Sequence, residues 1–373
     1  MKTIKFVCLT LIIVLCAAFG FACEWGGSIP ETPGGKENAK PVDGSPILFD
    51  ETMDFYNTDP SVIIEGEVKY IFYTVNSEAQ AGKATIAVRK ATKSEGAWVY
   101  GEKKTVITPS NEGFDSFSAS NADVIKGVFK YKGQTYSYLM AYQGCENTAA
   151  KNHKIGFAVA NQADGEWVKV ENLLIESAVT TAYGVAQPSL ISYDKAGKVV
   201  VCYSHDWGTH TSQMFREMIA EDLSNPVLGV ENGFATNGLK EGDSLITFNN
   251  ADFAYDSESG YLYVVRDYNP AAAKGCKLNT AVQVAKILFK DVFSTEAKWS
   301  IVEDKVDWRD LRDANDAEKL GWVYVYSACI QADEYGQVNG AESFDLAITV
   351  TSYDQETFEY LYYQTITECV IEL

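Results

Sequence analysis

The feature that most constrains the fold of this chain is a unit that recurs roughly every 65 residues. Its first copy places an apolar strand pattern at residues 58–63, turn residues at 65–66 and a second strand pattern at 69–74. The five copies align on Ser61, Asp123, Ser189, Asp252 and Ala328. A fixed period of this length indicates a repeated supersecondary unit whose copies cover one another's apolar faces.

Each copy continues with two more strand patterns, so the unit is a four-stranded antiparallel sheet. The fourth pattern carries a tryptophan in three copies, at Trp98, Trp167 and Trp299. The third copy is atypical, because residues 223–226 replace that tryptophan strand. Such sheets pack radially in β-propellers. We therefore predict an all-β fold, a five-bladed β-propeller with four-stranded antiparallel blades over residues 46–373, and reject a large β-sandwich, which explains no such period.

Composition narrows the classes of partner. The chain has 373 residues, of which 46% are hydrophobic, enough to bury a sizeable core. Its formal net charge of -20 argues against nucleic acid and against an anionic membrane surface, since both require clustered lysine and arginine. Neutral ligands, cations and sugars remain. We expect a carbohydrate partner and a monomer.

The N-terminal residues predict export. Lys2 and Lys5 precede an apolar run over residues 6–21, which is the pattern of a signal peptide over residues 1–23. Cys23 stands where a bacterial lipoprotein carries its lipid, and residues 24–45 have the Gly, Pro and Glu content of a flexible tether. We expect an extracytoplasmic protein, lipid-anchored at the bacterial cell surface and touching the membrane only through that anchor. Simple secretion is the alternative.

The repeat also predicts one shared polar pocket. In an antiparallel blade the start of the first strand and the end of the second lie at the same face, and the inner strands converge on a central channel. The candidates at the starts of first strands are Asp59, Asn121, Asp123, Gln187, Asn250 and Asp252. Those at the ends of second strands are His205, Asp206, Trp207, Arg266 and Asp267. Turn capping is the simpler role for Asp59, Asn121 and Asn250 taken singly, but their repetition at one register favours the pocket.

Two short motifs resemble a known family. Asp59-Pro60-Ser61-Val62 in the first copy and Ala122-Asp123-Val124 in the second are similar to motifs of the five-bladed glycosidases of the arabinanase and β-xylosidase type, the superfamily that is like glycosyl hydrolase family 43. This resemblance implies that Asp59 is the general base and that Asp123 orients the site. It also implies an acidic Glu two residues before a proline in the third copy. Ala186 occupies that position in this chain.

The missing acid leaves the chemistry open. Glycoside hydrolysis normally needs two carboxyl groups, and the amide of Gln187 cannot donate an acidic proton. Replacement acids at the same rim are Glu146, Asp206, Asp252 and His205. Crowding of Asp59, Asp123 and Asp252 would raise at least one carboxyl pKa, as a general acid requires. The same crowding would suit a divalent cation in the central channel; no other cofactor is predicted.

We therefore predict a surface glycoside hydrolase that cleaves O-glycosidic bonds of poly- or oligosaccharides with inversion. Asp59, Asp123 and Asp252 are its candidate catalytic residues. A non-catalytic glycan-binding propeller is the alternative, supported by Ala186. An interaction scaffold without a small ligand is a third reading, because many unrelated functions share the propeller fold.

Overall fold

The fold was taken from a computed structural model of the chain. It describes residues 39–41, 57–76, 83–239, 248–268, 281–307, 310–311, 322–352 and 364–373. The predicted signal peptide and Cys23 lie outside the described residues, as does the predicted tether apart from Ala39–Pro41. None of the helices described is long and apolar enough to cross a membrane.

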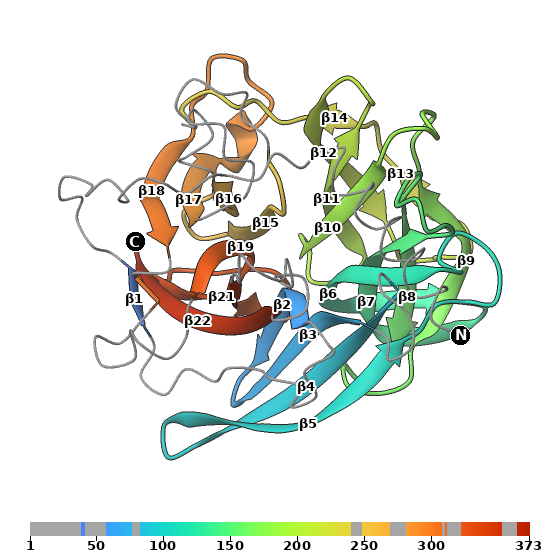
Figure 1. Cartoon of the computed structure of the whole chain (residues 1–373), viewed down its shortest axis with the longest axis horizontal. Helices are drawn as coiled ribbons and strands as arrows, with labels where there is room; N and C mark the ends of the chain where they lie inside the picture. Colours follow the sequence, from blue (N-terminus) through green and yellow to red (C-terminus); the bar gives the residue numbers. More distant parts are fainter. Residues whose placement is uncertain are drawn as a thin grey trace, which may run out of the picture.

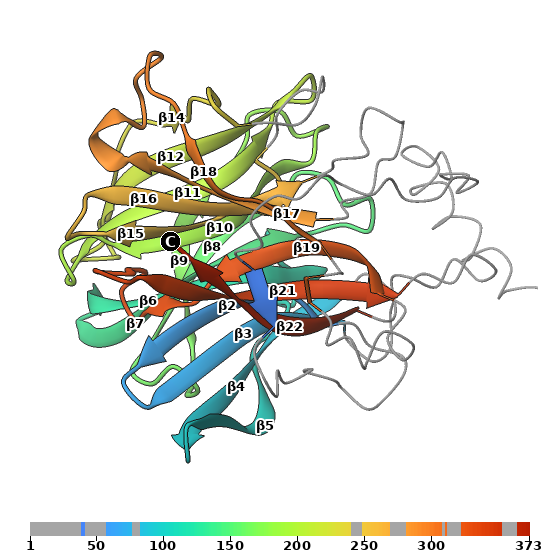
Figure 2. The same cartoon turned by 90° about the vertical axis from the view of Figure 1, so that its left-hand side faces the viewer.

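The described residues form a five-bladed β-propeller, which confirms the predicted fold class. Figure 1 looks onto the ring, with the first strand of every blade near the centre and the last at the rim. Figure 2 shows the ring turned by 90°, with β14 and β5 at opposite ends. Within each blade all neighbouring strands pair antiparallel.

The strands of each blade follow one another from the channel outward. Blade one is β2 (Asn57–Glu65), β3 (Val68–Asn76), β4 (Ala84–Ser94) and β5 (Ala97–Ile107). Blade two is β6 (Ser118–Tyr131), β7 (Gln134–Cys145), β8 (Lys154–Ala160) and β9 (Val168–Ile175). Blade three is β10 (Gly184–Ser192), β11 (Lys198–Asp206), β12 (Thr211–Ile219), β13 (Val227–Leu228) and β14 (Asn232–Gly233). Blade four is β15 (Asp252–Asp256), β16 (Tyr261–Tyr268), β17 (Ala281–Leu288) and β18 (Ser300–Asp307). Blade five is β19 (Trp322–Ile330), β21 (Ser343–Ser352), β22 (Gln364–Glu372) and β1 (Ala39–Pro41).

Two blades depart from the regular pattern. Blade three has two short strands, β13 and β14, beside β12 in place of one full outer strand, as its atypical sequence predicted. In blade five the outermost strand is β1, which comes from the other end of the chain and pairs with β22. The two ends of the described chain are thus joined in one sheet (Figures 1 and 2).

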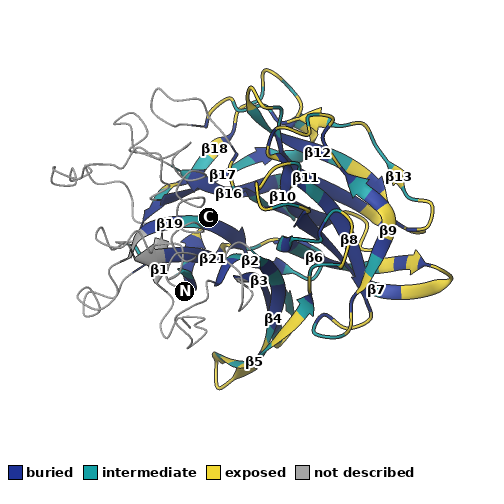
Figure 3. Ribbon diagram, turned by 45° about the vertical axis from the view of Figure 1, so that its right-hand side comes forward, coloured by how far each residue is buried: buried dark blue, intermediate teal, exposed yellow. Residues whose placement is uncertain are grey.

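The apolar core lies between the blades, with one cluster at each of the five interfaces. Successive residues of an inner strand face opposite sides: Val124 packs against blade one, and Ile125 packs against blade three. Inner strands are therefore buried on both faces (Figure 3). Outer strands such as β5 are largely exposed, because one side of them faces solvent.

One loop ties the whole ring together at the face where the first strands end. We call residues 331–340, between β19 and β21, the blade-five loop; it includes β20 (Ala332–Asp333). It meets blades one to four in order, through the parallel pairing of β20 with β2 and then through three backbone hydrogen bonds. The donors and acceptors are Lys126 N to Glu334 O (2.6 Å), Ser192 N to Tyr335 O (2.9 Å) and Tyr255 N to Gly336 O (3.1 Å).

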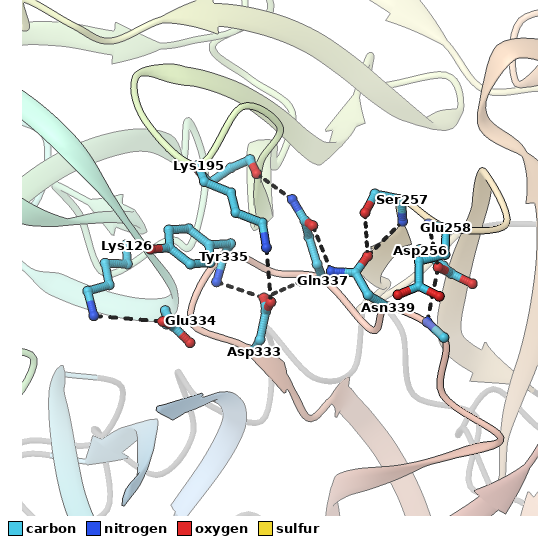
Figure 4. A network of polar contacts seen from close by, with 12 residues as sticks. Lys126, Lys195, Asp256, Ser257, Glu258, Asp333, Glu334, Tyr335, Gln337 and Asn339 are labelled. Carbon is cyan, nitrogen blue, oxygen red and sulfur yellow. Dashed lines mark hydrogen bonds and ion pairs between the residues drawn. The ribbon is translucent and has the colours of Figure 1, made fainter. Parts of the chain in front are cut away.

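Side chains reinforce these contacts (Figure 4). The Lys126 ammonium lies 3.7 Å from Glu334, and Gln337 Nε2 donates to the Ser192 carbonyl at 2.9 Å. Gly336 has a φ of 73°, and a Cβ there would lie 2.7 Å from the Leu190 carbonyl oxygen. Only glycine allows the loop to approach blade three so closely.

A buried ion pair joins the first blade to the last. Lys69 on β3 lies 2.8 Å from Glu368 on β22, and both side chains are almost fully buried. The Tyr100 hydroxyl and Gln331 Nε2 also donate to Glu368, and the Lys69 ammonium lies 4.8 Å from the centre of the Trp98 ring. The charges are thus paired and further satisfied at the interface that closes the ring.

We expect Lys69→Met to lower the free energy of unfolding by about 3–5 kcal/mol, because it removes the cation beside a buried carboxylate. Urea denaturation followed by tryptophan fluorescence measures this change. The double variant Lys69→Met/Glu368→Gln is the control, and it should regain most of the loss. Equal stability of the two variants would contradict a buried charge pair at this interface.

Candidate functional site

Each blade has, within its inner strand or just before it, a residue in the left-handed region of φ. These five residues, which we call the first tier, have φ values of 44–56° and are Asp59, Asn121, Gln187, Asn250 and Ser327. In four blades the pairing of the first two strands shifts register at this point, which marks a β-bulge. The fifth-blade equivalent of Asp59 is thus Ser327, so the sequence alignment on Ala328 was displaced by one residue.

An interblade hydrogen bond accompanies the strained backbone. The N–H of the first-tier residue donates to a side chain on the preceding blade, such as Asn121 N to Thr74 Oγ1 (2.9 Å) and Asp59 N to Thr349 Oγ1 (3.2 Å). In Asn250 the N–H donates to Gln187 Oε1, also of the preceding blade, at 3.0 Å. A non-glycine residue in this region costs about 1–3 kcal/mol, and the bond helps to offset that cost.

A hydrogen-bonded chain links the first-tier side chains. Ser327 Oγ donates to Asp59 Oδ1 at 2.6 Å, and Ser327 N donates to Asp267 Oδ1 at 2.7 Å. Asn250 Nδ2 donates to the other oxygen of Asp267 at 2.6 Å, while the Gln187 amide donates to Asn250. Four blades thus contribute to one connected polar floor.

Two residues further along each inner strand lies a second tier, made of Ser61, Asp123, Ser189, Asp252 and Cys329. At about 3.3 Å per residue it lies roughly 7 Å deeper in the channel. Each carboxylate of this tier bridges its two neighbouring blades. Asp123 accepts from Ser61 Oγ and from Leu190 N (2.5 Å), and Asp252 accepts from Ser189 Oγ (2.8 Å) and from Ile330 N (2.8 Å).

Burial dominates the electrostatics of the three predicted catalytic carboxyl groups. It raises the pKa of Asp59, although hydroxyl groups of Ser327 and Thr74 oppose the shift. Burial raises the pKa of Asp123 to about 6, and burial together with the charge of Asp123 raises that of Asp252 to about 8. Repulsion between carboxylates, the cause expected from the sequence, is thus the smaller effect.

The two tiers line a common pocket, to which Asp59, Asn121, Asp123, Gln187, Asn250 and Asp252 all contribute. Its volume is about 40 Å³, which is room for about three water molecules. Sites for small organic ligands usually span about 300–1,000 Å³. A sugar ring therefore has to lie above the first tier, at the mouth of the channel, and cannot reach the second.

The predicted residues at the ends of second strands take other positions. Asp267 is buried and holds Asn250 and Ser327 of the first tier. Arg266 is fully buried and donates to Gln283 Oε1 at 2.8 Å on the neighbouring strand β17. Neither it nor His205, Asp206 and Trp207 lines the pocket.

His205, Asp206 and Trp207 instead support the segment that leads into blade three. His205 contacts Ser177 Oγ through Nε2 (2.9 Å) and Glu231 through Nδ1 (3.0 Å), and the Trp207 ring stacks on it at 3.6 Å. Asp206 accepts the backbone N–H of Tyr183 at 2.9 Å.

Sequence reasoning missed several residues of the pocket. Ser327 and the second-tier serines, Ser61 and Ser189, carry hydrogen bonds that organise it. The signal was present, because both second-tier serines stand two residues after a first-tier position in their own blades. In the part of the chain that the structure describes, no three His, Cys, Asp or Glu side chains gather where they could hold a metal ion.

The raised pKa of Asp252 predicts a pH-dependent stability. The folded protein keeps a proton that the unfolded chain releases above its ordinary pKa of 3.8, so stability falls as pH rises from about 4 through about 8. We expect the free energy of unfolding, measured in urea at pH 5 and pH 8, to fall less in Asp252→Asn than in the natural protein. The difference should be on the order of 1 kcal/mol or more. An identical fall in both proteins would contradict the raised pKa.

Comparisons with known proteins identify the fold. No protein-family model matches the chain, and neither does any curated protein. A family 117 glycoside hydrolase from the marine bacterium Zobellia galactanivorans matches with a TM-score of 0.54 and 14% identity, over 90% of this chain and 91% of its own. The GH43_1 enzyme from Xanthomonas citri, complexed with xylotriose, matches with a TM-score of 0.53 and 12% identity, over 87% and 89%.

A third solved structure agrees. The α-L-arabinofuranosidase from Podospora anserina, in complex with cellotriose, matches with a TM-score of 0.50 and 9% identity, over 87% of this chain and 93% of its own. The chain thus has the fold of the five-bladed glycoside hydrolases, as the sequence motifs predicted.

Proposed function

We propose that this protein is a glycoside hydrolase that cleaves O-glycosidic bonds of poly- or oligosaccharides at the mouth of the central pocket. The observation that carries the proposal is the composition of the first tier. Asp59 is its one carboxylate, and amides or hydroxyls stand at the equivalent positions of the other four blades. Amide and hydroxyl groups hydrogen-bond sugar hydroxyls, and a carboxylate among them can activate water.

Asp59 is the general base in this proposal. Ser327 donates to its Oδ1, and the carboxylate held in this way can accept a proton from water. In an inverting reaction that water attacks the anomeric carbon on the face opposite the leaving group, and a proton donor stands on the other side of the bond. Asn121, Gln187 and Asn250 would hold the sugar, while Asp123 and Asp252 brace the blades beneath it.

Glycan binding without turnover is the second candidate, and Ala186 favours it. This residue stands where the resembling family carries its acid, its methyl group donates no proton, and it is buried. Asp123 and Asp252 lie in the second tier and accept hydrogen bonds between blades through both oxygens, so they do not reach a sugar above the first tier.

A glycan library screen on the chain that begins at residue 24 tests the two candidates. For a hydrolase we expect release of reducing sugar, and Asp59→Asn should lower kcat by about 10²–10⁴-fold while ligand binding persists. Glu112→Gln, on an exposed turn, is the matched control and should keep full activity.

The other outcomes separate the candidates. Binding by both the natural protein and Asp59→Asn, with no turnover of any glycan, would establish the binding module. No sugar-dependent thermal shift in either protein would exclude both.

We also propose that Cys23 carries a lipid that anchors a monomeric propeller outside the cytoplasm, at the bacterial cell surface. The basis is the charged start, the apolar run and the position of Cys23. Cys23→Ala should move the protein from the membrane fraction to the soluble extracytoplasmic fraction and abolish labelling by a fatty-acid analogue. Labelling that persists in the variant would contradict the anchor. Light scattering on the soluble form should give the mass of one chain.

A further inference from the structure

Tyr183 stands one residue before β10, and its hydroxyl is linked through the Gln143 side chain to Gln187 of the first tier. Gln143 Nε2 donates to the Tyr183 hydroxyl oxygen at 3.0 Å. The other end of the same amide, Gln143 Oε1, accepts the backbone N–H of Gln187 at 3.4 Å. Two hydrogen bonds therefore connect the phenol to the backbone of Gln187, a residue that lines the pocket.

The ring of Tyr183 is fixed in place. It stacks on the His153 imidazole with 4.1 Å between ring centres and 29° between planes. The residue is 40% exposed. Its backbone is held on both sides, because its N–H donates to Asp206 (2.9 Å) and its carbonyl accepts from His153 N (2.7 Å). A ligand above the first tier thus meets a preoriented phenol.

The direction of the hydroxyl proton follows from the neighbouring amide. Since Gln143 Oε1 accepts from Gln187, its NH₂ group is the end that faces Tyr183 and His153 Nδ1 (2.8 Å). The Tyr183 oxygen is therefore an acceptor in this contact, and its own proton is left to donate elsewhere. Among the described residues no acceptor for that proton is seen.

Burial keeps this proton on the phenol before a ligand arrives. Burial of the hydroxyl, with a further contribution from the negative charge of Asp59, raises the pKa of Tyr183 to about 12. The alkoxide that leaves in glycoside hydrolysis is a stronger base than a phenolate, so the phenol can protonate it as the glycosidic bond breaks.

We propose that Tyr183 is the proton donor to the leaving oxygen, in place of the carboxylic acid that Ala186 lacks. This inference rests on the proposed hydrolase function. Asp59 takes a proton from water, whose oxygen bonds to the anomeric carbon while the bond from that carbon to the leaving oxygen breaks. The leaving oxygen takes the Tyr183 proton, and the phenolate regains one from solvent as Asp59 releases its own.

The carboxyl groups nearby are poorer donors. Asp123 and Asp252 lie in the second tier and line the deeper part of the pocket, which has room for only a few water molecules. Asp267 is 2% exposed and is enclosed beneath Asn250 and Ser327. The two oxygens of Asp206 accept the N–H groups of Tyr183 and Gly208.

Tyr183→Phe tests the proposal, because it keeps the stacked ring and removes only the hydroxyl. Two substrates of the same sugar are compared: an oligosaccharide, whose leaving oxygen needs a proton, and a nitrophenyl glycoside, whose leaving group departs without one. We expect kcat/KM to fall by about 10²–10⁴-fold for the oligosaccharide and by less than about tenfold for the nitrophenyl glycoside. Tyr193→Phe, on a half-exposed tyrosine away from the pocket, is the control and should change neither rate.

The outcomes separate this inference from the proposed function. Retained oligosaccharide hydrolysis in Tyr183→Phe, or an equal fall for both substrates, would overturn the proton-donor role and leave Asp59 as the base of a working hydrolase. A natural protein that hydrolyses neither substrate would overturn the proposed function and this inference together. Nitrophenyl turnover by the variant shows that it is folded.

Discussion

The arrangement of the ring depends on one interaction, the hydrogen bond from a left-handed backbone N–H to a side chain of the blade before it. Asp59 bonds to Thr349 in this way, and Asn121 bonds to Thr74. The same conformation bulges the inner strand and brings the side chain of that residue to the central pocket. Scaffold and pocket are thus built by one set of contacts, and a change at a first-tier residue affects the joint between two blades as well as the ligand.

Much of this architecture could be predicted from the sequence, because each blade repeats the same pattern of apolar strands and turns. The period predicts five blades, and the recurring polar residues at one register predict the pocket. The fifth blade was aligned one residue too early, at Ala328 in place of Cys329. The polar residue of blade five, Ser327, is identified by its left-handed backbone conformation. The residue type alone does not predict that conformation.

The positions at the ends of second strands were harder to predict, because successive side chains on a strand face opposite sides. Asp267 faces the first tier, whereas its neighbour Arg266 faces Gln283 on the next strand. Choosing between them requires the register of the pairing, which sequence does not supply. Tyr183 lies outside the pattern of strand starts and ends from which the site residues were predicted. In the structure its ring stacks on His153 and its hydroxyl accepts from Gln143, contacts that the repeat does not reveal.

The blade-five loop has a consequence for how the molecule is completed. Its contacts with the inner strands of blades one to four come from residues 331–340, near the end of the chain. During synthesis the first strands of blades one to four can therefore bond to this loop only after about the final tenth of the polypeptide has been made. A chain that stops before that point can form four blades, but it lacks the loop that joins the ends of their first strands. The ring can therefore close only when translation is nearly complete.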